Sequence, residues 1–353
     1  MTRPTPARRT LARAAAAIAA ATAALAAAGC STTSTGSEGS TGATAGTVAD
    51  ADAFPVTIEH AYGKTTIESE PHRVATLGWV DQDHALALGV VPVGAIEITW
   101  GGNDQLSTPW FDARLEELGG EQPTRYSDAD GAPVEQIAEL APDLILATNS
   151  GITAEEYQQL SKIAPVVAYP GDPWLTTWED SLAMVGKALG RTELAAEVRE
   201  ETEAAMDEAA EENPQIVGKT FIFAALGTTD MSKIDFYMPG DNRPKLLTDL
   251  GMVNAPIIEE LSKPGQFYGT VSAERAADLE ADVFLTYGET EGDAATFRDH
   301  PLLGQIPAWE GGHVLVSTDK TDALGMSSPS PLSIPYAMDH FIPQVAAAVD
   351  GTA

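Results

Sequence analysis

The stretch VEQIAELAPDLIL (residues 134–146) has a counterpart later in the chain, SAERAADLEADVFL (residues 272–285). Each copy has the pattern of a helix followed by a short apolar strand. Ala, Leu and Asp are common in this chain, so chance is an alternative, but identities kept in register favour a duplicated unit. The matched pairs are Glu135 with Glu274, Ala138 with Ala277, Leu140 with Leu279, Asp143 with Asp282, and Leu146 with Leu285.

Outside the two copies, apolar strand patterns alternate with helix patterns. The first half has strands RVATLGW, VVPVGAIEI, PDLILAT and PVVAYP, separated by helices DQDHALALG, PVEQIAEL and TAEEYQQLSKI. The second half has strands KTFIFAALG, DVFLTYG and HVLVST, and PYAMDHFIPQVAAAV as a closing helix. This alternation predicts an α/β fold with mainly parallel sheets. With the repeat, it predicts two similar α/β lobes.

A long helix is expected between the lobes. Residues 192–212 contain no Gly or Pro and would form a helix about 31 Å long. We therefore expect an N-terminal lobe at 54–173, a helical linker at 174–217 and a C-terminal lobe at 218–353. Two α/β lobes joined in this way are expected to enclose a ligand cleft, lined by loops at the carboxyl ends of the strands.

The N-terminus has the pattern of a targeting segment. An arginine-containing start and an alanine-rich apolar run end in LAAAGC, which resembles a bacterial lipobox. We expect a lipoprotein signal peptide at 1–29, a lipidated Cys30, and a flexible Ser/Thr/Gly tether at 30–53. The protein would then be exported and anchored to the outer face of the cell membrane. An ordinary cleaved signal is the alternative, and Arg8–Arg9 leaves both Sec and twin-arginine export open.

The charge and the cysteine count exclude several classes of protein. The formal net charge of the 353 residues is −32, which argues against nucleic acid and against an anionic membrane face as binding partners. Cys30 is the only cysteine, so the chain cannot form an internal disulfide.

Aromatic residues gather where strands end. Such residues, flanked by Gly and Pro, favour a cleft lining over a core position. Four follow predicted strands, and two lie in the segments IDFYMPGDNRP and KPGQFYG, which are expected to be irregular. The six are Trp79, Trp100, Trp174, Tyr287, Tyr237 and Tyr268.

Three phrases identify a family resemblance: RVATLGWVDQDHALALGVVPVG, APDLILATNSGITAEEYQQLSKIAPVVAYP and FYMPGDNRPKLLTDLG. They resemble the substrate-binding lipoproteins of bacterial ABC importers for ferric siderophores, in the class with a rigid inter-lobe helix. The resemblance runs from about Pro55 to the C-terminus. It implies a receptor that delivers cargo to a membrane permease, with Glu135 and Glu274 docking onto permease arginines. Alternatively, these are first-turn acids that complement helix dipoles.

The cargo is expected to be neutral or cationic, because arginines are few and the chain is acidic. A ferric hydroxamate fits better than a triply anionic catecholate complex. Arg243, in PGDNRP, is the best single donor to hydroxamate oxygens, and a loop ion pair with Asp241 is the alternative. The siderophore itself would hold the iron, so neither a resident cofactor nor a protein metal ligand is expected. The expected ligand-binding residues are Trp79, Trp100, Trp174, Tyr237, Arg243, Tyr268 and Tyr287.

Other functions are weighed against this one. The 6 histidines form no close cluster, which disfavours a receptor for a bare metal ion. A haem receptor with Tyr237, Tyr268 or Tyr287 as axial ligand stays open, as does a cobalamin receptor. No G-x-S-x-G motif or nucleophilic cysteine supports a hydrolase, so an enzyme is not expected. GMSSPSPLS (residues 325–333) is expected to be a loop that could reach the cleft. A surface sensor or scaffold is the remaining alternative.

Overall fold

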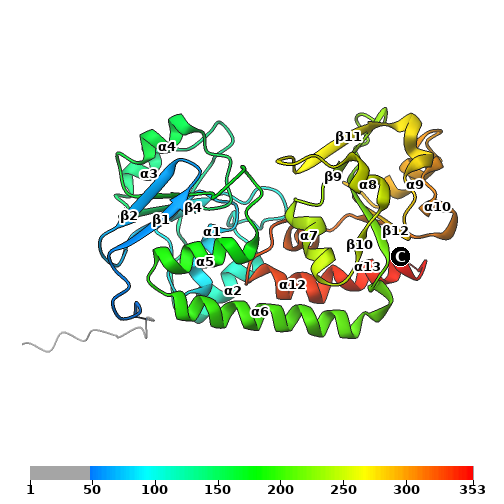
Figure 1. The fold of residues 1–353 in the computed structure, drawn as a ribbon. Coiled ribbons are helices and arrows are strands. Elements are labelled where there is room, and N and C mark those ends of the chain that lie inside the picture. Colours follow the sequence, from blue (N-terminus) through cyan, green and yellow to red (C-terminus); the bar gives the residue numbers. More distant parts are fainter. Residues whose placement is uncertain (1–47, 353) are drawn as a thin grey trace, which may run out of the picture. The chain divides into compact units, whose positions relative to one another are not determined.

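In the computed structural model, the two copies of the repeat occupy corresponding places in two α/β lobes (Figure 1). The structure describes residues 48–352. The predicted signal peptide, the lipidation site Cys30 and most of the predicted tether lie outside these residues. Within residues 48–352, no helix combines the length and the apolar character needed to cross a membrane.

The N-terminal lobe holds a 5-stranded parallel sheet, preceded by the antiparallel hairpin of β1 (Val56–His60) and β2 (Gly63–Ile67). The spatial order is β5-β4-β3-β6-β7, so the direction of winding reverses between β3 and β6. Such a reversal leaves a crevice at the carboxyl ends of the two strands. The sheet strands are β3 (Val74–Thr76), β4 (Gly94–Ile96), β5 (Thr124–Tyr126), β6 (Leu144–Ala147) and β7 (Val166–Ala168). The helices are α1 (Asp81–Ala87), α2 (Pro109–Glu117), α3 (Val134–Glu139) and α4 (Ala154–Leu160).

The C-terminal lobe repeats this plan with an addition. Its parallel strands are β10 (Val253–Asn254), β8 (Thr220–Ala225), β12 (Val283–Tyr287) and β13 (Val314–Ser317), in that spatial order. The second half of β8 pairs instead with an antiparallel ribbon of β9 (Lys233–Tyr237) and β11 (Tyr268–Ser272). The helical elements are α7 (Asn242–Asp249), α8 (Pro256–Leu261), η2 (Ala273–Asp278), α9 (Asp293–Asp299), η3 (Leu303–Gln305) and α10 (Ala308–Gly311).

The antiparallel ribbon corrects one expectation. Tyr237 and Tyr268 do not lie in irregular segments, because they face each other across β9 and β11. The side chains of β9 alternate between more and less buried positions, as a half-buried strand requires. Flanking Gly and Pro residues hid this alternation in the sequence. The overall expectation of an α/β fold with mainly parallel sheets is confirmed.

The repeated aspartate has the same structural task in both lobes. Asp143 accepts hydrogen bonds from the backbone N–H groups of His72 and Arg73, at 2.9 and 2.8 Å, just before β3 begins. Asp282 accepts from the backbone N–H of Thr220, the first residue of β8, at 2.8 Å. Each carboxylate therefore ties the start of β6 or β12 to the start of the neighbouring strand.

Helices join the lobes along one side (Figure 1). α5 (Trp178–Ala188) leads into α6 (Thr192–Glu212), which matches the predicted long helix and is followed by η1 (Pro214–Ile216). α6 is not alone, because α12 (Ser333–His340) packs against it. α11 (Lys320–Ser327) precedes α12, so residues 325–327 end a helix instead of forming a loop.

The expected closing helix is divided in two. α12 ends at His340 and α13 (Ile342–Val349) begins two residues later, with Pro343 in its first turn. Proline has no backbone N–H and its ring clashes with the preceding turn, so it is tolerated at the start of a helix but not inside one. The sequence PYAMDHFIPQVAAAV therefore cannot continue as a single helix.

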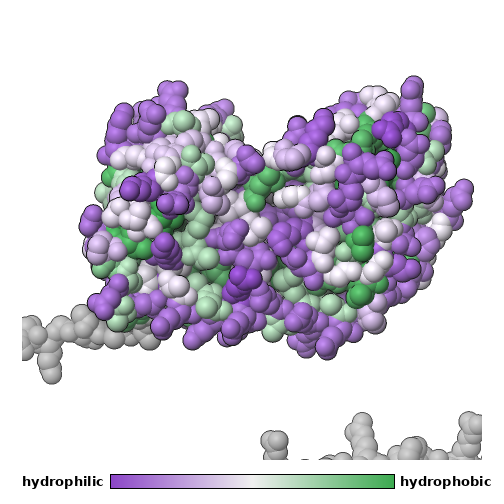
Figure 2. Space-filling model, viewed as in Figure 1, coloured by the Kyte–Doolittle hydropathy of each residue, from purple (hydrophilic) through white to green (hydrophobic). Residues whose placement is uncertain are grey.

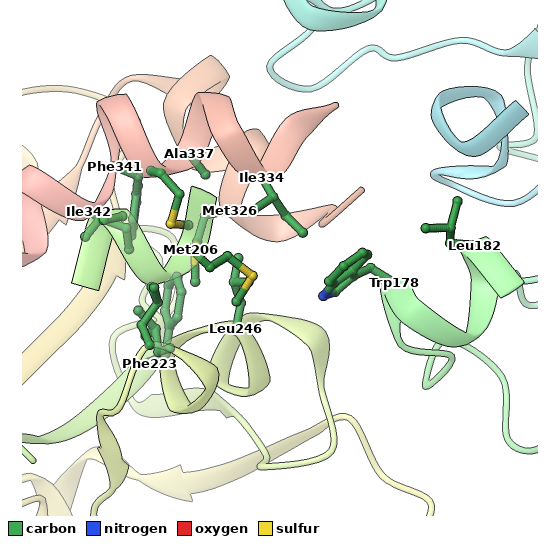
Figure 3. Packing of buried hydrophobic residues seen from close by; sticks show 14 of the residues in the cluster. Trp178, Leu182, Met206, Phe223, Leu246, Met326, Ile334, Ala337, Phe341 and Ile342 are labelled. Atoms are coloured by element: carbon green, nitrogen blue, oxygen red, sulfur yellow. The ribbon is translucent and has the colours of Figure 1, made fainter. Parts of the chain in front are cut away.

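The largest hydrophobic cluster continues from one lobe to the other (Figure 3). It includes Leu182 of α5, Met206 of α6, Ile334 of α12 and Phe223 of β8, together with Leu144 from the N-terminal sheet. Interiors are close-packed, so sliding one lobe over the other would disrupt many contacts at once. The shared core favours small adjustments between the lobes over a wide hinge motion.

Candidate ligand-binding site

A cavity of about 280 Å³ lies between the lobes, where the surface is hollowed in Figure 2. Cavities of about 600 and 640 Å³ lie elsewhere, but neither is lined by any of the aromatic residues predicted to bind ligand. The inter-lobe cavity is therefore the better candidate despite its smaller size. Its lining residues are Trp79, Asn149, Trp174, Asp241, Asn242, Arg243, Phe267 and Ser327.

The N-terminal wall is built at the winding reversal. Trp79 follows β3 and Asn149 follows β6. The backbone N–H of Trp79 donates to the backbone carbonyl of Asn149 at 3.1 Å. Below them, the buried Asp81 accepts hydrogen bonds from the N–H groups of Gly78 and Thr148, and from the Thr148 hydroxyl. Burial raises the pKa of Asp81 to about 6, and these hydrogen bonds limit the rise. One carboxylate thus holds both cleft loops in place.

Trp174 is held in an uncommon backbone conformation. Its φ angle is 65°, in the left-handed region that non-glycine residues seldom adopt. Its backbone N–H donates to the Ser150 carbonyl at 3.3 Å. Its indole lies against Gly151, where a Cβ atom would come within 2.6 Å of the indole Nε1. Gly151 is therefore what allows the Trp174 side chain to occupy this wall.

Arg243 supplies a positive charge to the opposite wall. Its Nη1 donates to Asp241 Oδ1 and Oδ2 at 3.0 and 2.9 Å, and Asp241 also accepts the Arg243 backbone N–H at the start of α7. The guanidinium carbon lies 4.2 Å from the centre of the Tyr237 ring and 6.0 Å from that of Trp79. Both roles weighed for Arg243 are therefore compatible: it forms the ion pair and still lines the cavity.

The electrostatics keep this guanidinium charged. Burial alone would lower the pKa of Arg243, but Asp241, Tyr287 and Tyr237 raise it above its ordinary value. Burial also raises the pKa of the Asp241 carboxyl, and Arg243 opposes that rise. The Arg243 Nε is buried and has no hydrogen-bond partner among residues 48–352. The cavity therefore contains a cation whose donors are not all used by the protein.

Tyr237 packs against this cation, but Tyr237, Tyr287, Trp100 and Tyr268 are not among the described residues that line the cavity. Tyr287 lies 6.4 Å from Tyr237 between ring centres, and its hydroxyl shares a 2.5 Å hydrogen bond with Ser327 of the cavity wall. Trp100 meets Tyr287 edge to face at 5.5 Å, which is a contact between the two lobes. Tyr268 is half exposed, and its ring centre lies 4.8 Å from that of Phe267, which lines the cavity. Burial raises the pKa of both Tyr237 and Tyr287.

Several lining residues were missed from the sequence: Asn149, Asn242, Phe267 and Ser327. Asn149 had a usable signal, because it directly follows the predicted strand PDLILAT. Phe267 directly precedes β11 and Ser327 ends α11, and neither element was expected. Among residues 48–352, no three His, Cys, Asp or Glu side chains are grouped so that they could hold a metal ion.

The two predicted docking glutamates lie away from this cavity. Glu135 is in the first turn of α3 and Glu274 in the first turn of η2, and both are exposed. η2 is a 3-10 helix where an α-helix was expected. The repeat thus places one acidic side chain on the surface of each lobe.

Comparison with known proteins agrees with this architecture. The model of the "Periplasmic binding protein" family matches residues 74–321. This chain belongs to that family. The match takes in the parallel sheets of both lobes, α5, α6 and every residue of the inter-lobe cavity except Ser327.

Three proteins of known description are similar to this chain. It is 29% identical to "Probable siderophore-binding lipoprotein YfiY" of Bacillus subtilis, over 65% of this chain and 69% of that protein. It is 37% identical to Streptococcus pneumoniae TIGR4 PiaA in complex with ferrichrome, with a TM-score of 0.79, covering 84% of this chain and 99% of that one. A periplasmic solute binding protein of Mycobacterium smegmatis is 29% identical, with a TM-score of 0.70, covering 83% and 98%. These relatives are binding proteins and not enzymes.

Proposed function

We propose that this chain is an extracytoplasmic receptor that binds a ferric siderophore and delivers it to the permease of an ABC importer. Of the siderophore classes, the hydroxamates are the favoured cargo. The observation that carries the proposal is Arg243, a charged guanidinium with an unused buried donor, set among aromatic rings in a cavity between two lobes. Such a site suits a compact ligand with acceptor oxygens at its centre and an organic shell around them.

The charge of the cavity favours hydroxamate over catecholate. A ferric trihydroxamate centre is neutral and presents a ring of oxygens that one guanidinium can contact. A ferric tricatecholate carries three negative charges. Arg243 is the only cation among the described residues that line the cavity, and Asp241 already neutralises it. The seven residues proposed to bind ligand are Trp79, Trp100, Trp174, Tyr237, Arg243, Tyr268 and Tyr287.

The relatives support the same cargo class. PiaA was solved with ferrichrome, which is a hydroxamate siderophore, and the Bacillus subtilis relative is described as siderophore-binding. Haem is less well supported, because a tyrosine that ligates haem iron must lose its proton. Burial raises the pKa of Tyr237 and Tyr287, which opposes that loss.

The test is a tryptophan-fluorescence titration of the purified protein with ferric hydroxamates, a ferric catecholate, haem and cobalamin. Saturable quenching by a ferric hydroxamate, absent with the other ligands, is the expected result. Quenching by haem alone, with a shift of the Soret band, would reassign the cargo to haem. No response to the whole panel would contradict a receptor for any of these ligands.

Delivery is proposed to use the paired glutamates. Glu135 and Glu274 would each contact an arginine of one permease subunit, since a dimeric permease offers two equivalent surfaces. Lipidated Cys30 would hold the receptor on the outer face of the cell membrane. Replacing both glutamates with alanine should leave siderophore affinity unchanged and abolish iron uptake by cells. Glu139→Ala, at another exposed position of α3, is the matched control and should preserve uptake. Uptake by the double variant at the wild-type rate would contradict the docking role.

A further inference from the structure

A smaller cavity of about 100 Å³ adjoins the ligand cavity. Trp174 lines both, so its side chain lies between the two spaces. The small cavity, called the side pocket below, is lined by the loops that follow β3, β5 and β6, including Asp128, Ser150, Gly151 and the helix residue Glu156. At roughly 30 Å³ for one water, it has room for a few heavy atoms. It is too small to admit a second chelate group.

The side pocket is acidic and has an aromatic wall. Asp128 and Glu156 are its ionisable lining residues, and no lysine or arginine is among the described residues that line it. Burial opposes ionisation of Glu156, but donors from Thr153 and Ala132 bring its pKa below the ordinary value. Asp128 forms no ion pair among residues 48–352, and burial raises the pKa of its carboxyl. Carboxylates beside an indole favour a small cation.

An independent observation on the same wall also points to a ligand with donors. Asn149 is 6% exposed and lines the main cavity, next in sequence to Ser150 and Gly151 of the side pocket. Its Oδ1 is buried and has no hydrogen-bond partner among residues 48–352. A buried acceptor without a donor is unfavourable. A ligand N–H placed against this wall would remove that penalty.

The cleft is therefore polarised. Its N-terminal wall offers acceptors, namely Asn149 Oδ1 and the carboxylates of Asp128 and Glu156. Its C-terminal wall offers the guanidinium of Arg243. A ligand with donors at one end and acceptor oxygens at the other would bind in one orientation.

We propose that the side pocket binds a primary ammonium group of the cargo, while Asn149 Oδ1 accepts a hydrogen bond from a cargo N–H. This inference rests on the proposed function and narrows it to ferric hydroxamates with a free terminal amine. The iron-bound oxygens then face Arg243 and the amine tail passes beside Trp174.

The test compares two ligands that differ only in this group: ferrioxamine B, a linear ferric trihydroxamate with a terminal ammonium, and its neutral N-acetyl derivative. The purified wild-type protein should bind the amine form about tenfold more tightly. Asp128→Asn should bring that ratio close to one and leave affinity for the acetylated form unchanged. Asp130→Asn is the matched control, because Asp130 is exposed and lines neither cavity, so it should keep the preference.

Each outcome decides a separate point. Equal affinity of the wild type for both ligands would overturn the ammonium site and leave the proposed function intact. If Asp128→Asn and Asp130→Asn lose the preference for the amine ligand equally, that preference comes from the overall negative charge of the protein. This result would also overturn the ammonium site. No binding of either ligand would contradict the inference and the hydroxamate assignment together. Asn149→Leu should weaken the binding of both ligands without lowering the unfolding free energy. Wild-type affinity in that variant would overturn the acceptor role of Asn149.

Discussion

Replacing Arg243 with glutamine separates the two roles that the structure combines in this residue. The side chains of Arg243 and Asp241 are only 14% and 4% exposed. Arg243→Gln would leave the Asp241 carboxylate buried without its counter-charge, which costs about 3–5 kcal/mol of unfolding free energy. Adding Asp241→Asn removes that charge. An asparagine oxygen can still accept the backbone N–H at the start of α7, so the double variant should recover most of the stability.

Affinity should respond differently from stability. A hydrogen bond from a charged donor contributes about 1.5–3 kcal/mol, so losing the guanidinium should weaken ferric hydroxamate binding roughly 10- to 150-fold. This loss should be the same in Arg243→Gln and in the double variant, because both lack the donor. The ion pair with Asp241 thus affects stability, and the donor facing the cavity affects affinity.

Two assays measure the two quantities. Denaturant unfolding followed by circular dichroism gives the unfolding free energy, and tryptophan quenching by a ferric hydroxamate gives the affinity. Lys245→Gln is the matched control on the same helix, since the Lys245 side chain is 31% exposed in its pairs with Glu179 and Asp249. It should lose at most about 1 kcal/mol and no affinity. Wild-type affinity in the double variant would refute the reasoning, because Arg243 would then act only through Asp241.

Three further predictions concern the cleft wall, the pH dependence of stability and the motion of the lobes. Gly151→Ala should displace the Trp174 indole and weaken siderophore binding by about tenfold, whereas Gly171→Ala, with nothing within 4 Å of the added Cβ, should bind as the wild type does; equal affinities would contradict this. Burial raises the pKa of Asp83 in the folded protein from 3.8 to about 6, so this carboxyl contributes stability that is complete below about pH 4 and lost as the pH rises to about 6. Between pH 4 and 7, the unfolding free energy of Asp83→Asn should therefore fall by about 3 kcal/mol less than that of the wild type, as measured by denaturant titrations. Parallel curves of unfolding free energy against pH would contradict this. Small-angle scattering profiles of the free and loaded protein should nearly coincide because the lobes share a core, so a large compaction on loading would refute the shared-core argument.

Patterns in the local sequence predicted much of the fold. The alternation of apolar strands with helices predicted the parallel sheets, and the Gly- and Pro-free run at 192–212 predicted α6 with its observed bounds. These features depend on residues close together in the chain, so their periodicity is visible without any partner. The ribbon of β9 and β11 was not visible, because these strands pair with each other and with the end of β8, whose residues are distant in sequence.

By itself, the sequence determined the α/β class, the repeat with its paired aspartates and glutamates, and the set of aromatic residues that could line a cleft. Only the tertiary structure decided how these residues meet. It placed Arg243 over Tyr237 and against Asp241, left Asn149 Oδ1 buried and unpartnered, and set Trp174 between two cavities. The direction in which a side chain faces depends on strand register and on loops packed from both lobes, and a shift of one residue turns a cleft residue into a core residue.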